Sequence, residues 1–143
     1  MIILDTDVLS LVQRDDSAGG LRVRARIAQL PPEELVATTI ISYHEQTRGW
    51  LAYIAKARTK AQQVDAYSLL AKHLDDYRAA RVLQYDRTAA DIFDQLRSDH
   101  PRGGTMDLRI AAIALWHKAL LVTRNLNDFE KIANLRVEDW TRS

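Results

Sequence analysis

Short apolar runs alternate along the chain with longer segments whose apolar residues recur every three or four positions. Runs rich in Ile, Leu, Val and Thr favour buried strands, and they predict strands at residues 1–5, 35–41, 81–85, 120–123 and 135–137. The intervening segments have the periodicity of amphipathic helices, which are predicted at residues 6–14, 21–30, 42–81 as two long helices, 87–98, 108–115 and in a short turn before the last strand. Gly19 and Gly20 are expected to break the chain before the second helix.

Strands that alternate with helices predict an α/β fold in which right-handed crossovers build a mostly parallel sheet. We expect a three-layer α/β/α sandwich with a four- to five-stranded sheet covered on both faces. Ligands of such sheets bind at the carboxyl ends of the strands, where Asp5 and the residues after Thr123 are expected. The length of 143 residues suits one domain, and we expect a single domain over residues 1–143.

Composition excludes some classes of site and protein but does not identify the function. The net charge of +1 indicates no whole-molecule attraction to nucleic acid, so any such binding must be local. The absence of cysteine excludes disulfides and thiolate metal sites. No apolar run approaches the roughly 20 residues needed to cross a bilayer, and we expect a cytoplasmic protein without a membrane segment. The run Arg22, Arg24 and Arg26 is typical of a solvated helix face.

Four segments each leave an acid beside an apolar run, and these acids are Asp5, Glu45, Asp107 and Asp128. If the fold gathers them at one edge of the sheet, two carboxylates about 4 Å apart repel each other by roughly 4 kcal/mol at an effective dielectric near 20. Such a cluster favours a bound cation. Ligands that are all oxygen atoms favour Mg²⁺ or Mn²⁺ over zinc.

Each acid also has a purely structural explanation. Asp5 suits an Asx-turn at a strand end. Glu45 follows Ser42 by three residues, the spacing of a capping box in which Ser42 caps the helix. The helix macrodipole favours Asp107 near a helix N-terminus, and Asp128 suits the cap of a helix that begins at Phe129. The convergence of all four segments is therefore the argument for a site.

These residues lie in stretches that resemble the PIN-domain nucleases, and among them the VapC-type toxins of toxin–antitoxin pairs. The resemblance extends from the first residues to the last and is carried by four stretches in order: Ile3 to Leu9, Thr39 to Glu45 with Gly49, Asp107 to Ala112, and Leu121 to Trp140. The chain departs from the family pattern at Asp7, where Asn is common, and at Gln46, where an apolar residue is usual.

The resemblance implies a ribonuclease that hydrolyses RNA phosphodiester bonds with Mg²⁺ or Mn²⁺. Its metal-binding acids correspond to Asp5, Glu45 and Asp107, and Asn125 or Asp128 fills the fourth acidic place. The predicted catalytic set is therefore Asp5, Glu45, Asp107 and Asp128. Neighbouring side chains are expected to orient ligands or water, namely Thr6, Ser42, Thr123 and Asn125.

An acidic site needs cationic side chains around it to hold the RNA backbone, and we expect these to be Arg48, Arg102 and Arg109. The resemblance also implies a homodimer, and a VapB-type antitoxin whose arm enters the acidic groove. The long apolar-striped helices between Glu45 and Arg81 are candidates for these interfaces.

Two alternatives remain open from the residues. Asp5-Thr6-Asp7-Val8 after a strand also resembles the nucleophile loop of haloacid-dehalogenase-type phosphatases, with Asp5 as nucleophile and Asp7, otherwise suited to a helix cap, as acid–base. The second alternative is a catalytically inactive PIN-like module that binds RNA or protein.

Overall fold

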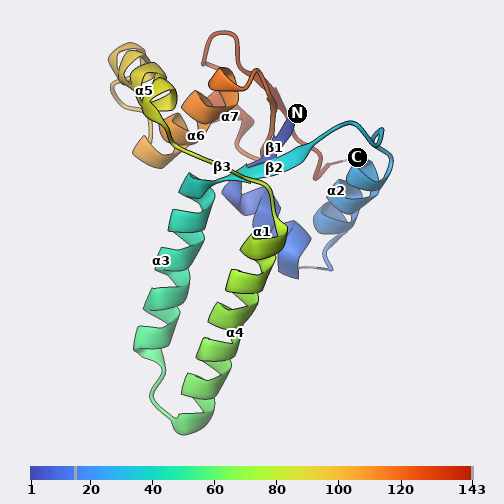
Figure 1. Ribbon diagram of the computed structural model, residues 1–143, viewed down its shortest axis with the longest axis vertical. Helices are drawn as coiled ribbons and strands as arrows, with labels where there is room; N and C mark the ends of the chain where they lie inside the picture. The colour runs from blue at the N-terminus through green and yellow to red at the C-terminus, as the bar shows by residue number, and fades with distance from the viewer. Residues whose placement is uncertain (15, 143) are drawn as a thin grey trace.

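A five-stranded parallel sheet forms the centre of the protein in a computed structural model that describes residues 1–14 and 16–142 (Figure 1). The strands are β1 (Ile2–Leu4), β2 (Val36–Thr39), β3 (Val82–Leu83), β4 (Leu120–Val122) and β5 (Arg136–Glu138). Their order in the sheet is β3-β2-β1-β4-β5, and every neighbouring pair is parallel. The predicted parallel α/β fold is confirmed, with β1 at the centre of the sheet.

Helices connect the strands and cover both faces of the sheet (Figure 1). They are α1 (Thr6–Arg14), α2 (Ala18–Ala28), α3 (Ile40–Lys56), α4 (Lys60–Ala79), α5 (Arg87–Asp99), α6 (Thr105–Trp116) and α7 (Leu126–Phe129). None of the helices in the described ranges is both long and apolar enough to cross a membrane.

Residues of β1 divide the core into two halves because successive side chains of a strand point to opposite faces. Ile3 packs on one face with residues of α5, α6 and α7, including Ala89, Ile110 and Phe129. Ile2 and Leu4 pack on the other face with residues of α1 and α2. Helix α6, apolar nearly all round, is buried in the first half, as its sequence indicated.

Two predicted element boundaries are wrong for the same reason, a capping side chain. The predicted second strand included Ile40 and Ile41, but Thr39 caps a helix that begins at Ile40, and its hydroxyl accepts a hydrogen bond from the Ser42 amide at 3.1 Å. Gly19 and Gly20 do not break the chain but lie in the first turn of α2, because the Ser17 side chain accepts from the Gly20 amide. Local capping outweighed β-propensity and glycine flexibility.

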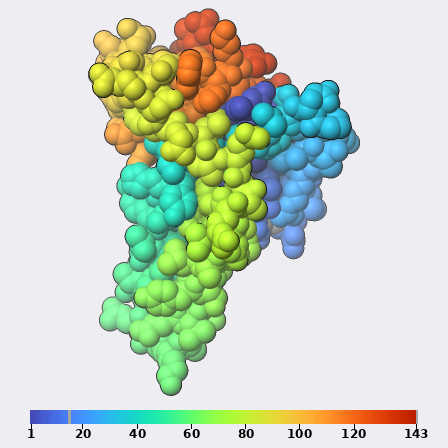
Figure 2. Space-filling view, in the orientation of Figure 1, coloured from blue at the N-terminus to red at the C-terminus, as the bar shows by residue number. Residues whose placement is uncertain are grey.

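Helices α3 and α4 form a hairpin that projects well beyond the sheet (Figures 1 and 2). A capping box of Thr59 and Gln62 starts α4 at the far end. Large apolar side chains of this hairpin are exposed, namely Leu51, Tyr53, Val64, Tyr67 and Leu74. The predicted pair of long helices is confirmed, and the fold leaves part of their apolar surface uncovered.

Candidate active site

Asp5 lies at the carboxyl end of the central strand, β1, with only 6% of its surface exposed. Its Oδ1 accepts a hydrogen bond from the Thr6 amide, and its Oδ2 accepts one from the Thr123 hydroxyl, both at 2.8 Å. Burial raises the pKa of Asp5 to about 6, although the two hydrogen bonds act in the opposite direction. Repulsion from Asp107 and Asp7 adds to the rise. Asp5 is therefore a buried carboxyl group whose negative form is poorly compensated.

Glu45 does not take part in the helix cap that its spacing suggested. Because Thr39, not Ser42, caps α3, Glu45 lies past the first turn, and its Oε1 accepts a hydrogen bond from the Thr6 hydroxyl at 2.7 Å. The same Thr6 hydroxyl lies 2.9 Å from that of Ser42. Thr6 thus connects Glu45 to the segment that begins with Asp5, and the capping-box explanation of Glu45 is wrong.

Asp107 lies in the first turn of α6, as predicted, where Gly104 precedes the helix without a side-chain cap. Burial raises the pKa of its carboxyl group, and the negative charges of Glu45, Asp128 and Asp7 raise it further. Since Asp107 also raises the pKa of Asp5, the acids from β1, α3 and α6 act on one another across the carboxyl edge of the sheet. We call Asp5, Glu45 and Asp107 the acidic edge.

The fourth acidic place involves a pair of side chains. The Asn125 amide group donates to Asp128 Oδ2 at 2.7 Å. Asp128 lies within α7 and is not its cap, since α7 begins at Leu126. Thr123, which donates to Asp5, accepts from the Asn125 backbone amide at 3.0 Å. Asn125 is therefore connected to both Asp128 and Thr123.

Divalent cations suit the donor chemistry of this edge. Within residues 1–14 and 16–142, the acidic edge has no ion pair with Lys, Arg or His. In the same ranges, no three His, Asp or Glu side chains lie close enough together to be ligands of one ion. Mg²⁺ is usually held by one or two carboxylates and retains several waters, so this arrangement fits Mg²⁺ without a three-acid cage.

The three predicted RNA-binding arginines lie in different surroundings. Arg102 lines a cavity that also includes Asp107. Arg48 is exposed on α3, one helical turn beyond Glu45. Arg109 instead packs with its guanidinium group 5.8 Å from the ring centre of Tyr85 and 5.5 Å from that of Phe93. The structure does not bring Arg109 together with Arg102 in this cavity.

Sequence reasoning missed other polar residues beside the site. Arg124 follows β4 and lies 3.9 Å from Asp7, which is inside α1 and does not cap it. His100 and Lys131 line the same cavity as Arg102. Arg124 could have been found from its position directly after a strand, because such positions lie at the functional edge of the sheet. Lys131 is brought there by the turn after α7, which no sequence pattern indicated.

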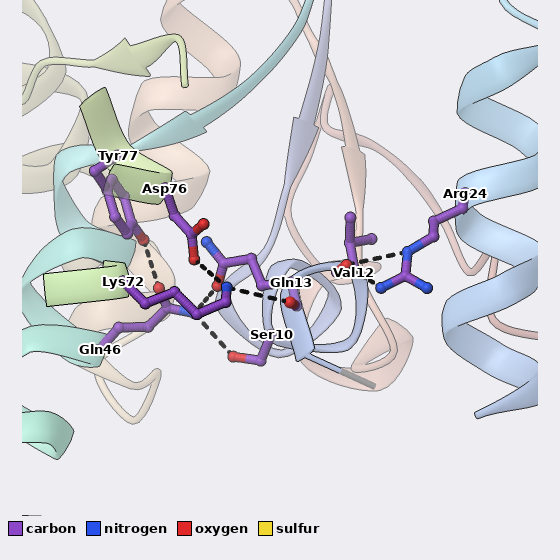
Figure 3. Close-up of polar contacts among 8 residues, drawn as sticks. All are labelled: Ser10, Val12, Gln13, Arg24, Gln46, Lys72, Asp76 and Tyr77. Carbon is purple, nitrogen blue, oxygen red and sulfur yellow. Dashed lines mark hydrogen bonds and ion pairs between the residues drawn. The ribbon is translucent and has the colours of Figure 1, made fainter. Parts of the chain in front are cut away.

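Gln46, which replaces a usual apolar residue, joins three helices (Figure 3). It accepts a hydrogen bond from the Tyr77 hydroxyl of α4 at 2.7 Å and donates to Ser10 and Gln13 of α1 at 2.9 and 3.2 Å. The polar side chain therefore has partners on both sides. It fixes the root of α3, next to Glu45, against α1 and α4.

Comparison with known proteins agrees with this fold. The sequence model of the PIN domain matches residues 2–135. Ribonuclease VapC1 of Haemophilus influenzae is 27% identical over 142 residues, which cover 98% of each chain. The tRNA(fMet)-specific endonuclease VapC of Salmonella typhimurium is 41% identical over 63 residues, which cover 41% of this chain and 48% of that protein.

Solved structures give the same result at the level of the fold. FitAcB from Neisseria gonorrhoeae superposes with a TM-score of 0.74 and 26% identity over the full length of both chains. VapBC-1 from nontypeable H. influenzae gives a TM-score of 0.73 and 24% identity over 99% of this chain and all of that one. The family assignment removes the dehalogenase-type alternative. The sequence model of the PIN domain matches nearly the whole sequence, and the chain therefore belongs to the PIN-domain family.

Proposed function

We propose that this PIN-domain protein is a metal-dependent ribonuclease that hydrolyses RNA phosphodiester bonds at its acidic edge. The observation that carries the proposal is that Asp5, Glu45 and Asp107, from three separate segments, lie at one edge of the sheet where their charges repel, without a cationic partner among the described residues. The names of the relatives, ribonuclease and endonuclease, support the same reaction class.

In this proposal Asp5 and Asp107 hold Mg²⁺ or Mn²⁺, and Glu45 completes the shell of this ion through water or holds a second ion. A bound divalent cation would activate water as a nucleophile and offset the charge on the phosphate. Thr123 and Thr6 fix the carboxylate of Asp5, and Thr6 also orients Glu45. These contacts hold the acids in place before the substrate arrives, and such outer contacts commonly matter for metal affinity.

RNA cleavage by the purified protein tests the proposal directly. We expect cleavage of single-stranded RNA with Mg²⁺ or Mn²⁺ and none in EDTA. Asp107→Asn should reduce the rate at least about 100-fold, because a preorganised charged group is worth several kcal/mol in such a site. Asp65→Asn, an exposed acid on α4, is the matched control and should leave the rate unchanged. Cleavage that survives both EDTA and Asp107→Asn would contradict the proposal.

The inactive-module alternative makes a different prediction. A PIN-like protein that only binds RNA or a partner has no need of the cation. Calorimetric titration with Mg²⁺ should show binding to the wild type and much weaker binding to Asp107→Asn. Absence of Mg²⁺ binding and of cleavage, with RNA binding retained, would favour the inactive module.

We further propose that the protein is the toxin of a toxin–antitoxin pair, with a VapB-type antitoxin as partner, and that it forms a homodimer. The VapBC and FitAB structures of its structural relatives support a two-protein assembly. The exposed apolar residues of the α3–α4 hairpin, such as Leu51 and Tyr67, supply surface for one of these interfaces. Expression without the antitoxin should arrest growth, and Asp5→Asn should relieve the arrest. Normal growth with the wild type would contradict the toxin role alone.

A further inference from the structure

A cavity of about 340 Å³ opens beside the acidic edge and shares Asp107 with it. Its walls come from the loop between α5 and α6, from the first turn of α6, and from α7 with the turn that follows it. This volume falls at the lower end of the roughly 300–1,000 Å³ typical of ligand pockets. Anything bound here lies next to the carboxylates that we assign to catalysis.

The lining combines an apolar floor with a rim of mixed charge, in which the carboxylates of Asp107 and Asp128 face two cations. Leu108, Phe129 and Ile132 form the floor and are at most 4% exposed. Arg102 and Lys131 stand on the rim, are exposed, and have no ion-pair partner within the described ranges. An occupant of matching chemistry has an apolar face for the floor and a negatively charged group for Arg102 and Lys131, held away from the two carboxylates.

The loop that carries Arg102 is held in place. The Arg97 guanidinium donates to the carbonyl groups of Pro101 at 3.2 Å and Gly103 at 2.8 Å, and to the Thr105 hydroxyl at 2.8 Å. Gly103 lies so close to the floor that an added Cβ would be 3.0 Å from a methyl group of Leu108. The backbone of this loop is therefore fixed before a ligand arrives, which reduces the entropy that binding costs.

We propose that this cavity, which we call the flanking pocket, binds the nucleotide adjacent to the cleaved phosphate of a single-stranded RNA. The proposal rests on the ribonuclease function proposed above. The base would lie on the apolar floor, and Arg102 and Lys131 would contact the phosphate on its far side. A basic protein arm would pair with Asp107 and Asp128 but would leave Arg102 and Lys131 without partners. Duplex RNA keeps its bases stacked inside the helix, so only an unpaired nucleotide can enter.

Binding of a fluorescein-labelled six-nucleotide RNA in EDTA, followed by anisotropy, tests the rim. Arg102→Ala/Lys131→Ala should weaken binding about tenfold. It should also reduce the slope of log affinity against log salt by about 1.4, since each lost contact to single-stranded RNA removes about 0.7. The matched control is Arg58→Ala/Lys60→Ala at the far end of the hairpin, which removes the same charges away from the pocket. The control should change neither quantity.

RNAs that carry one abasic nucleotide test the floor. One position of the six should weaken binding to the wild type when its base is removed, and the same position should matter less in Arg102→Ala/Lys131→Ala. Equal losses in the pocket and control variants, or no abasic position that matters, would overturn the proposal. Pocket variants that keep RNA affinity but lose antitoxin affinity would also overturn it.

The outcomes separate the pocket from the reaction. A wild type that binds RNA with this pattern but does not cleave it in Mg²⁺ would contradict the ribonuclease function and leave the pocket standing. Cleavage by the wild type, together with pocket variants that match the control, would contradict the pocket alone. Both changed side chains of the pocket are exposed, so circular dichroism should show folded variants.

Discussion

Two charged regions of the protein differ in the interaction partners that the fold provides for their charged side chains. In the seam between α2 and the C-terminal segment, Arg22 donates to the Thr141 carbonyl at 2.9 Å, and Arg26 lies 4.5 Å from the ring centre of Trp140. Arg24 donates to the Val12 carbonyl (Figure 3). At the acidic edge, Asp5 and Glu45 receive only hydroxyl and amide donors, and no cation of the described ranges pairs with them.

The contrast indicates which charged side chains stabilise the fold and which are left without a compensating partner. The three arginines are typical of a solvated helix face in the sequence, but their partners make them structural. The acids resemble helix caps and turn residues, but they remain uncompensated. Functional residues are expected at positions where the structure departs from what local sequence patterns predict. The predictions below test this contrast, from the largest expected effect to the smallest.

Removal of the central charge should have the largest effect. Asp5→Asn should reduce RNA cleavage at least about 100-fold, because it removes a proposed metal ligand and a charge at the reacting centre. The amide preserves the shape and can still bond with Thr6 and Thr123. In EDTA at pH 7.5 the variant should melt no lower than the wild type. Retained cleavage, or a large loss of thermal stability, would contradict the assignment of Asp5.

The pKa of Asp5 predicts how the metal-free fold responds to pH. The pKa is raised from 3.8 to about 6 in the folded protein, so the folded state holds this proton more tightly than the unfolded chain. The resulting stability is fully present below pH 3.8 and is lost as the pH rises through about 6. It amounts to about 3 kcal/mol.

Urea unfolding in EDTA at several pH values measures this contribution. The difference in unfolding free energy between wild type and Asp5→Asn should change by about 2.5 kcal/mol between pH 3.8 and pH 7, in the direction that disfavours the wild type at high pH. A difference that does not depend on pH would show that Asp5 is ionised normally.

Replacement of Thr6 should have an intermediate effect on RNA cleavage, because its hydroxyl contacts Glu45 and Ser42. Thr6→Val keeps the shape of the side chain but removes the hydroxyl, and cleavage should fall about tenfold, as is common when a group that orients a ligand is lost. Thr6→Ser should restore most of the activity. If Thr6→Val were as active as Thr6→Ser, Glu45 would not depend on this contact.

Replacement of Arg24 should have the smallest effect on the protein and should leave the rate of RNA cleavage unchanged. Arg24→Met keeps the length of the side chain but loses the hydrogen bond to Val12, which should lower the unfolding free energy by about 1 kcal/mol. Cleavage and RNA affinity should stay within about twofold of the wild type. A marked loss of RNA affinity would instead place Arg24 on the substrate-binding surface.

Helix α3 shows why the sequence predicted some features and missed others. Its apolar periodicity indicated a long helix, but its start depended on whether Thr39 or Ser42 acts as the cap. Both residues suit the role, and the spacing to Glu45 favoured Ser42. The structure uses Thr39, which frees Glu45 to meet Thr6. Competing local signals of similar strength are decided by tertiary packing.

The sequence by itself determined the alternation of strands and helices, the parallel sheet and the positions of Asp5 and Asp107 at element ends, because these follow from periodicity and capping within short windows. Only the tertiary structure decided which charges find partners. It paired Arg22, Arg24 and Arg26 with distant carbonyl groups and an aromatic ring, packed Arg109 against Tyr85 and Phe93, and brought Lys131 to the cavity that Arg102 lines. Compensation of a charge depends on residues far apart in the chain, which no local pattern encodes.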